Sequence, residues 1–275
     1  MIKSKRKRRM NEGVQYLFLS VISFISLFPF VWMLIGATNK SMDITMGKLT
    51  FGNQFMINFR NLLDSGDLLV CLRNSVILSI FITTLSMLVC SLAGYGFVVF
   101  QSKTKEIFFS IILLSMMVPT SSLVIPMFKM FSGIGILNTK IGVILPAVST
   151  AFLIFFFRQN TKSFPMETIQ SARIDGLSEF GIFVRIFMPM MKSTYAAAAI
   201  ITFMSSWNNY MWPLISLQTK DQRTLPLLIS SLGTAYTPDY GMIMVGIIIT
   251  TIPSALIFFV MQKNFVNSMM GAVKS

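Results

Sequence analysis

The sequence predicts an all-α integral membrane protein with six transmembrane helices. Of its 275 residues, 54% are hydrophobic and only 12% are charged, whereas about 25% of a typical soluble domain is charged. Six stretches without Asp, Glu, Lys or Arg are long and apolar enough to cross a bilayer as helices. A cluster of positive charge directly precedes the first stretch, as is common beside a first transmembrane helix.

The six predicted spans form one transmembrane domain that comprises residues 1–275. They cover residues 14–36, 74–100, 107–128, 137–157, 193–217 and 241–261. A seventh charge-free run, 224–238, is too short to span and contains Pro226 and Pro238. We expect an interfacial or re-entrant piece there.

The basic residues before the first span indicate its orientation. They are Lys3, Lys5, Arg6, Lys7, Arg8 and Arg9. Short cytoplasmic segments are enriched in Lys and Arg, so we expect a cytoplasmic N-terminus, and six spans return the C-terminus to the same side. A net charge of +13 also occurs in nucleic-acid-binding proteins, but its position beside a span favours membrane orientation, and we expect lipid contact and no nucleic-acid partner. The apolar run is longer than that of a signal peptide, so the first span is expected to remain uncleaved.

The third and fifth spans contain polar residues, which are costly at membrane depth unless they face a bundle or a cavity. The third holds two serines between Pro119 and Pro126, and the fifth has the sequence SSWNNYMW from position 205. One interpretation is a polar path for a solute. The alternatives are a packing kink in the third span and, in the fifth, hydrogen bonds between helices beside an interfacial aromatic belt. The candidate path residues are Ser121, Ser122, Ser205, Asn208 and Asn209.

The segment between the fourth and fifth predicted spans, PMETIQSARIDGLSEFGIFVRIFMP from Pro165 to Pro189, is the chain's main polar insert on the basic, cytoplasmic side. Pro165 suits the start of a helix, Gly176 interrupts it, and Ser178 can cap a second helix. Its carboxylates could be catalytic, but no second group is poised to work with them and the chain contains no histidine. An amphipathic interfacial helix and a docking site for a soluble partner remain the other two interpretations.

The run SARIDG, from Ser171 to Gly176, resembles the EAA loop of ATP-binding-cassette importer permeases, whose usual form is E-A-A-x-x-x-G. The usual Glu-Ala is replaced by Gln170-Ser171, which keeps a helical surface and lacks one negative charge. Further motifs resemble the smaller of the two permease subunits in the maltose-type carbohydrate family. These motifs are RNS at 73–75, SWNN-x-x-WPL at 206–214, LPL at 225–227 and GAVK at 271–274.

This resemblance implies a multi-pass permease subunit in the cytoplasmic membrane of a prokaryote. It would move a carbohydrate, a di- or oligosaccharide, by alternating access. Its partners would be a second, different permease subunit, a dimer of cytoplasmic ATPase subunits and an extracytoplasmic solute-binding protein. The loop 163–189 would act as the coupling helix between the fourth and fifth spans, and the tail from Gly271 to Ser275 would also approach the ATPases. The docking face implied by the resemblance consists of Gln170, Ser171, Ala172, Asp175 and Gly176.

The chain has no G-x-x-x-x-G-K-[ST] motif to hold nucleotide phosphates. We therefore expect no enzymatic activity and no cofactor in this chain, with ATP and magnesium on the partner ATPases. The alternatives are a permease for a non-sugar solute such as a phosphorylated polyol, an ion-coupled secondary carrier, and a membrane scaffold. An ion-coupled carrier would need ionisable residues inside its spans. The six charge-free stretches, 13–39, 74–102, 107–128, 141–157, 193–219 and 240–262, contain no Asp, Glu, Lys or Arg.

Overall fold

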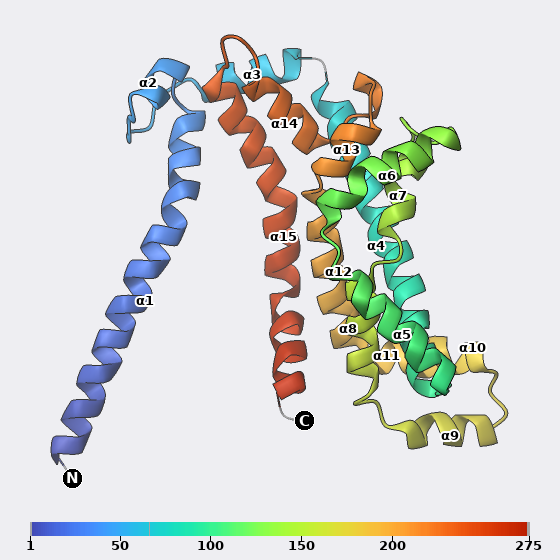
Figure 1. The fold of residues 1–275 in the computed structure, drawn as a ribbon. Coiled ribbons are helices and arrows are strands. Elements are labelled where there is room, and N and C mark those ends of the chain that lie inside the picture. The colour runs from blue at the N-terminus through green and yellow to red at the C-terminus, as the bar shows by residue number, and fades with distance from the viewer. Residues whose placement is uncertain (1, 66, 274–275) are drawn as a thin grey trace. The chain divides into compact units, whose positions relative to one another are not determined.

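The computed structural model of the chain describes the backbone of residues 2–65 and 67–273, and the side chains of 13–65, 67–260 and 262. Every regular element in these ranges is a helix (Figure 1), which confirms the predicted all-α class. Three helices are long and apolar enough to cross a membrane by themselves: Gly13–Ala37 within α1 (Ile2–Ala37), α4 (Leu68–Val99), and Tyr240–Val260 within α15 (Tyr240–Val273).

The other candidate spans are pairs of helices that are bent at a short break. The bend is 102° between α5 (Lys103–Ser115) and α6 (Thr120–Gly133), and 41° between α7 (Lys140–Ala147) and α8 (Ala151–Thr161). It is 82° between Glu179–Met190 and α12 (Lys192–Trp207). The chain thus has three to six candidate spans, depending on whether each bent pair crosses the membrane as one.

The helix boundaries differ from the predicted spans at several places. The stretch predicted as a third span, 107–128, is divided by the sharp bend before α6, where Pro119 has no N–H to continue a helical ladder. The helix predicted from residue 74 begins at Leu68, and the one predicted to end at 261 continues to Val273. The charge-free run 224–238 contains a short helix, α14 (Leu225–Gly233).

The chain folds as two compact units, and each is described by itself. The first comprises residues 1–66 and 229–251, and the second comprises 67–228 and 252–275. In the first unit, the short helices α2 (Ser41–Thr45) and α3 (Phe55–Asp64) follow α1. Asn58 on α3 is buried and donates from Nδ2 to the carbonyl oxygens of Ala37 at 2.9 Å and Asn39 at 3.0 Å. This side chain therefore ties α3 to the end of α1.

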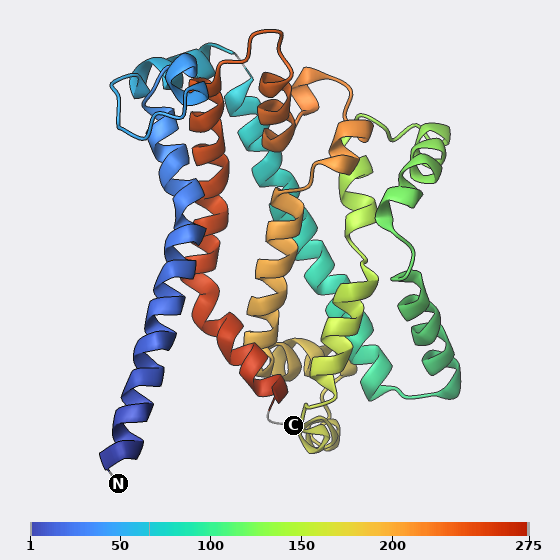
Figure 2. The same ribbon diagram turned by 60° about the vertical axis from the view of Figure 1, so that its left-hand side comes forward.

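In the second unit, α4 packs most extensively against α8 and α12, and Figures 1 and 2 show these three helices side by side. Gly94 on α4 lies directly against α8. A Cβ atom at this position would lie 2.7 Å from Cβ of Phe157 and 2.8 Å from the backbone nitrogen of Arg158. Only glycine lets α4 and α8 pack at this distance. Cys90 and Cys71 are buried on the same helix as free thiols.

Gly94→Ala is expected to destabilise the protein by about 1–3 kcal/mol, because the added methyl group meets the backbone of α8 rather than a side chain that can move away. Thermal unfolding of the purified protein in detergent measures this change. Gly96→Ala, two residues along α4, is the matched control, since a Cβ there has no atom within 4 Å. The control is expected to be neutral or to stabilise by roughly 0.5–1 kcal/mol. Equal melting temperatures for the two variants would contradict the close approach.

Candidate functional site

Residues 163–189, here called the docking segment, fold as two short helices around a tight turn. They contain α9 (Met166–Ile174), α10 (Glu179–Ile182), a π-helical turn η1 (Phe183–Phe187) and the start of α11 (Met188–Met190). Gly176 ends α9 in the left-handed region, with φ of +81°. The N–H of Gly176 donates to Arg173 O and that of Leu177 to Ala172 O, the paired bonds of a Schellman motif. Ser178 caps α10 by accepting from the N–H of Gly181 at 3.2 Å.

One face of the docking segment is buried against the end of α4. The cluster there comprises Tyr95, Phe164, Ile169, Ala172, Ile182, Phe183, Phe187 and Met191. The ring of Tyr95 contacts Phe183 and Phe187 edge-on, with centroids 5.3 and 4.9 Å apart. α9 is therefore packed directly against the end of α4.

An ion pair closes the turn between α9 and α10. Arg173 donates from Nε to Oε1 of Glu179 at 2.6 Å and from Nη2 to Oε2 at 3.2 Å. This hydrogen bonding lowers the pKa of Glu179. The hydroxyl of Tyr95 also donates to Oε2 of Glu179 at 3.5 Å. Glu179 thus stays ionised and positions the two helices, which disfavours a role for it in proton transfer.

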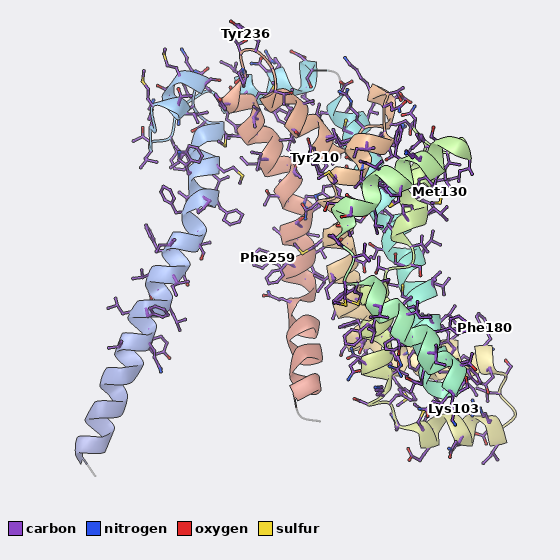
Figure 3. All side chains as sticks on the ribbon, viewed as in Figure 1. Lys103, Met130, Phe180, Tyr210, Tyr236 and Phe259 are labelled. Carbon is purple, nitrogen blue, oxygen red and sulfur yellow. The ribbon has the colours of Figure 1, made fainter. Side chains whose placement is uncertain are left out.

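The opposite face of the docking segment is exposed, and it holds four of the five residues predicted to dock: Gln170, Ser171, Asp175 and Gly176. Ala172, the fifth, is only 4% exposed and lies beneath this face, in the cluster with Tyr95. The exposed face of α9 also presents Ile174, which is 86% exposed. Phe180 on α10, labelled in Figure 3, is 68% exposed as well. Sequence reasoning missed both. The signal for Ile174 was available, because it lies four residues beyond Gln170 and three beyond Ser171 and so shares their side of the helix.

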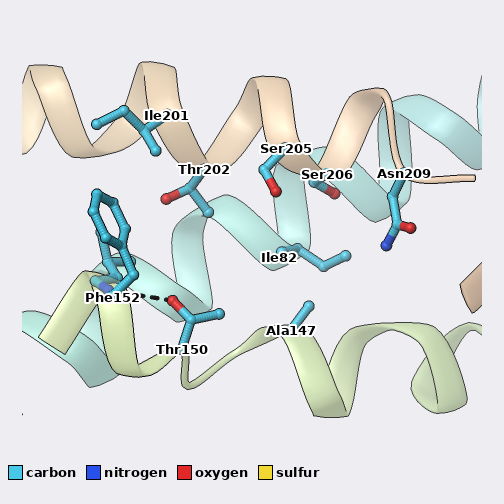
Figure 4. Close-up of a pocket in the computed structure, with 10 residues that line it drawn as sticks. Ile82, Ala147, Thr150, Phe152, Ile201, Thr202, Ser205, Ser206 and Asn209 are labelled. Atoms are coloured by element: carbon cyan, nitrogen blue, oxygen red, sulfur yellow. Dashed lines mark hydrogen bonds between the residues drawn. The ribbon is translucent and has the colours of Figure 1, made fainter. Parts of the chain in front are cut away.

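A second candidate site is a cavity of about 200 Å³ in the second unit, where two breaks in helices face α4. One break separates α7 from α8, and the other separates α12 from α13 (Met211–Ser216). Figure 4 shows α12 presenting a row of polar side chains toward Thr150 and Ala147. The residues lining the cavity are Ile82, Ala147, Thr150, Phe152, Leu153, Ile201, Thr202, Ser205, Ser206 and Asn209. We call this cavity the polar pocket.

Side chains satisfy the backbone groups freed at the α7–α8 break. Ser86 on α4 donates to Ala147 O at 2.9 Å, and the Cys90 thiol lies 3.6 Å from Val148 O. Thr150 accepts from the N–H of Leu153 and so caps α8. Non-helical backbone at membrane depth is tolerated where it is satisfied in this way or lines a cavity. Both conditions hold at this break.

The structure brings only part of the predicted path together. Ser205 and Asn209 line the polar pocket. Asn208 does not, and its Nδ2 instead donates to Met204 O at 2.9 Å. Ser121 and Ser122 are exposed on α6 and are absent from the pocket lining. Thr150, Thr202 and Ser206 are the polar lining residues that the sequence interpretation did not select as candidates.

The lining of α12 follows the helical period. Thr202, Ser205 and Ser206 are spaced at i, i+3 and i+4 on α12, which places them on one face, and Asn209 follows in the break after the helix. This spacing could have identified Thr202 from the sequence. It could not have shown that Thr150, at a distant break, completes the opposite side.

The family model for the binding-protein-dependent transport system inner membrane component matches residues 86–271 of this chain. The chain belongs to this family. Its members are transport subunits, so the protein is a permease of an ABC importer rather than an enzyme, and it resides in the inner membrane as a multi-pass protein. The family description also implies a binding protein and an ATPase as partners. An ion-coupled carrier and a catalytic role for the docking segment are thereby set aside.

Individual relatives cover nearly the whole chain. The lactose transport system permease protein LacG of Rhizobium radiobacter is 48% identical over 98% of both chains. The arabinooligosaccharides transport system permease protein AraQ of Bacillus subtilis is 35% identical over 94% of both. The sn-glycerol-3-phosphate transport system permease protein UgpE of Escherichia coli K12 is 28% identical, covering 91% of this chain and 92% of its own.

A solved structure confirms the fold of this ABC importer permease. A chain from the crystal structure of a bacterial ABC transporter involved in the import of the acidic polysaccharide alginate matches with a TM-score of 0.85. The match covers 94% of this chain and 98% of that chain at 19% sequence identity. Permease families of this kind carry no cofactor of their own. In the described part of the chain, no group of three or more His, Cys, Asp or Glu could hold a metal ion.

Proposed function

We propose that this permease imports a neutral carbohydrate, a di- or oligosaccharide, by alternating access as the smaller of two different permease subunits. The observation that carries this proposal is the 48% identity to a lactose permease over 98% of both chains. A relative named for arabinooligosaccharides, at 35% identity, supports the same solute class. The second permease, a dimer of ATPase subunits and the solute-binding protein complete the proposed complex, with both termini of this chain in the cytoplasm of a prokaryote.

The docking segment is the proposed contact with an ATPase subunit. Its exposed face combines polar residues with Ile174, whose apolar side chain is left almost fully uncovered. Exposed apolar surface with a polar rim is typical of a protein interface. Its buried face joins α4, so a movement of the ATPase would reach the membrane helices through Tyr95 and its neighbours. The proposed tail contact, Gly271–Ser275, lies outside the residues whose side chains the structure describes.

A phosphorylated polyol is the second candidate solute, because a permease for sn-glycerol-3-phosphate is 28% identical to this chain. A phosphate group is normally bound by Arg, Lys or backbone N–H groups at a helix start. Among the described residues that line the polar pocket there is no Arg or Lys. This difference favours the neutral sugar.

Uptake by the complete transporter in liposomes tests the proposal. The two permeases, the ATPases and the binding protein are reconstituted with ATP on the ATPase side, and radiolabelled lactose, an arabinooligosaccharide and sn-glycerol-3-phosphate are offered separately. Uptake of at least one neutral sugar that requires ATP and the binding protein is the expected result. Uptake of sn-glycerol-3-phosphate alone would contradict the proposed solute class.

A further inference from the structure

The polar pocket has the chemistry of a site for a small, uncharged, many-hydroxyl solute. Four of its side chains carry hydroxyl groups and a fifth carries an amide: Thr150, Thr202, Ser205, Ser206 and Asn209. Such groups both donate and accept hydrogen bonds. None of the ten lining residues is ionisable. Within this pocket, therefore, a charged solute would lose its water without gaining a counter-charge.

One lining hydroxyl stands out because it is buried without being satisfied. Oγ of Ser206 has less than 1 Å² of accessible surface and no hydrogen-bond partner among the described residues. Figure 4 shows its side chain on the pocket side of α12, between those of Ser205 and Asn209. A buried hydroxyl without a partner is unfavourable. A change of rotamer would bring Oγ to the pocket, where a hydroxyl group of the solute would become its partner.

The pocket also has an apolar side and a limited volume. Phe152, which is 44% exposed, contributes an aromatic ring at one end, and Ile82 lies between the polar rows (Figure 4). The C–H face of a sugar ring can pack on such a ring while its hydroxyl groups meet the polar side chains. A volume of about 200 Å³ is smaller than the roughly 300–1,000 Å³ of pockets for drug-sized ligands. One sugar ring fits this description better than a whole oligosaccharide.

We propose that the polar pocket is a binding subsite for a single uncharged sugar ring of the transported solute, held by Asn209, Ser206 and Thr202 and packed on Phe152. The proposal rests on the proposed function of sugar import. It adds that this chain itself, rather than its partners alone, contacts the sugar during passage. It also assigns the selection against phosphorylated solutes in part to this pocket.

Thiol labelling in the complete reconstituted transporter tests direct occupancy. Both native cysteines have 0% exposure, so they give little background. A cysteine is introduced as Ser205→Cys in the pocket, and as Ser132→Cys on exposed α6 for the control. The rate of reaction with N-ethylmaleimide is measured with and without lactose, and with and without sn-glycerol-3-phosphate. Lactose is expected to slow labelling at 205 but not at 132, and sn-glycerol-3-phosphate is expected to slow neither.

Uptake kinetics provide the second measurement. Asn209→Leu removes hydrogen-bonding groups from the pocket and is expected to raise the half-saturating lactose concentration about 2- to 12-fold, the range for one neutral hydrogen bond. Asn208→Leu is the matched control, because Asn208 does not line the pocket. Its half-saturating concentration is expected to stay within about twofold of the original. A purely structural role for Asn209 would instead lower the melting temperature and leave this concentration unchanged.

The outcomes separate the subsite from the sugar importer. If the transporter takes up lactose but lactose does not protect position 205, the subsite is refuted and sugar import stands. Equal protection by sn-glycerol-3-phosphate would refute the selectivity for uncharged solutes. Protection by lactose without uptake would support the subsite and count against the proposed function. If lactose is neither taken up nor protective while sn-glycerol-3-phosphate is transported, both proposals fail.

Discussion

Gly176→Arg is expected to lower uptake by the assembled transporter about tenfold or more, the factor that follows from ~1.4 kcal/mol of lost docking free energy. Gly176 has φ of +81° at the exposed end of α9, and a Cβ there would meet no atom within 4 Å. An arginine side chain would therefore project from the proposed docking face without disturbing the core beneath it. Uptake and ATPase activity are measured together in liposomes, and the melting temperature shows whether the membrane helices remain folded.

Gly176→Asn separates the effect of a large side chain from the effect of backbone strain. The left-handed conformation costs most residues roughly 1–2 kcal/mol, and asparagine adopts it more readily than they do. This control is expected to keep most of the uptake. Normal uptake and normal ATPase stimulation in the arginine variant would contradict a docking role for this turn.

Arg158→Ala is expected to cause a large loss of stability, about 2–4 kcal/mol. Arg158 lies near the end of α8 and its side chain is only 10% exposed. Its Nη2 donates to Oε2 of Glu106 on α5 at 2.7 Å, and its guanidinium lies 3.8 Å from the ring centroid of Phe109. The alanine variant removes the ion pair, the contact with the ring and the packing of a long side chain. Thermal unfolding of the purified complex measures the change.

Glu106→Gln removes the negative charge and keeps the size of the side chain, so it measures the contribution of the ion pair without that of packing. The side chain of Glu106 is 51% exposed, so solvent screens the pair, and the expected loss is about 1 kcal/mol rather than the 3–5 kcal/mol typical of a fully buried pair. A double-mutant cycle with Arg158→Ala should show that the two effects are not additive. Strict additivity would mean that the pair contributes nothing to holding α5 on α8.

The docking segment was largely predictable because its signals are local. Gly176 marks the end of α9 and Ser178 caps α10, and both follow from the chemistry of helix ends. The burial of Ala172 could not be read in the same way, because it depends on Tyr95, which is distant in sequence and packs against this turn. The family pattern gave Ala172 the same weight as its exposed neighbours. The structure instead places it under the surface that they form.

The broken helices were less predictable for a physical reason. A charge-free run of suitable length indicates that a segment can lie in the membrane, but it does not determine whether the helix stays straight. Pro119 and Pro146 were visible in the sequence, yet the bends near them are 102° and 41°. The size of each bend depends on which neighbouring side chains hydrogen-bond the backbone carbonyl groups that the break leaves unpaired. Ser86, for example, donates to the carbonyl oxygen of Ala147.

Two motifs that supported the family resemblance prove to contact each other. Asn74, in the RNS motif, donates from Nδ2 to the carbonyl oxygens of Asp221 at 2.8 Å and Arg223 at 3.0 Å. Its neighbour Ser75 accepts from the N–H of Leu225, the first residue of the LPL motif, at 2.7 Å. The start of α4 thus holds the connection that leads into α14. Sequence alone showed the motifs but gave no reason for their pairing.

The proposed contact between the exposed face of the docking segment and an ATPase subunit can be tested by site-specific photo-crosslinking in the assembled transporter. A benzophenone amino acid is placed at Ile174, which is 86% exposed on α9. The matched control carries the same group in place of Ile125, which is 68% exposed on α6, outside the segment. We expect a crosslink from position 174 to the ATPase subunit and none from position 125. A crosslink from 174 only to lipid or to the second permease, in a complex that still transports, would contradict docking of this face on the ATPase.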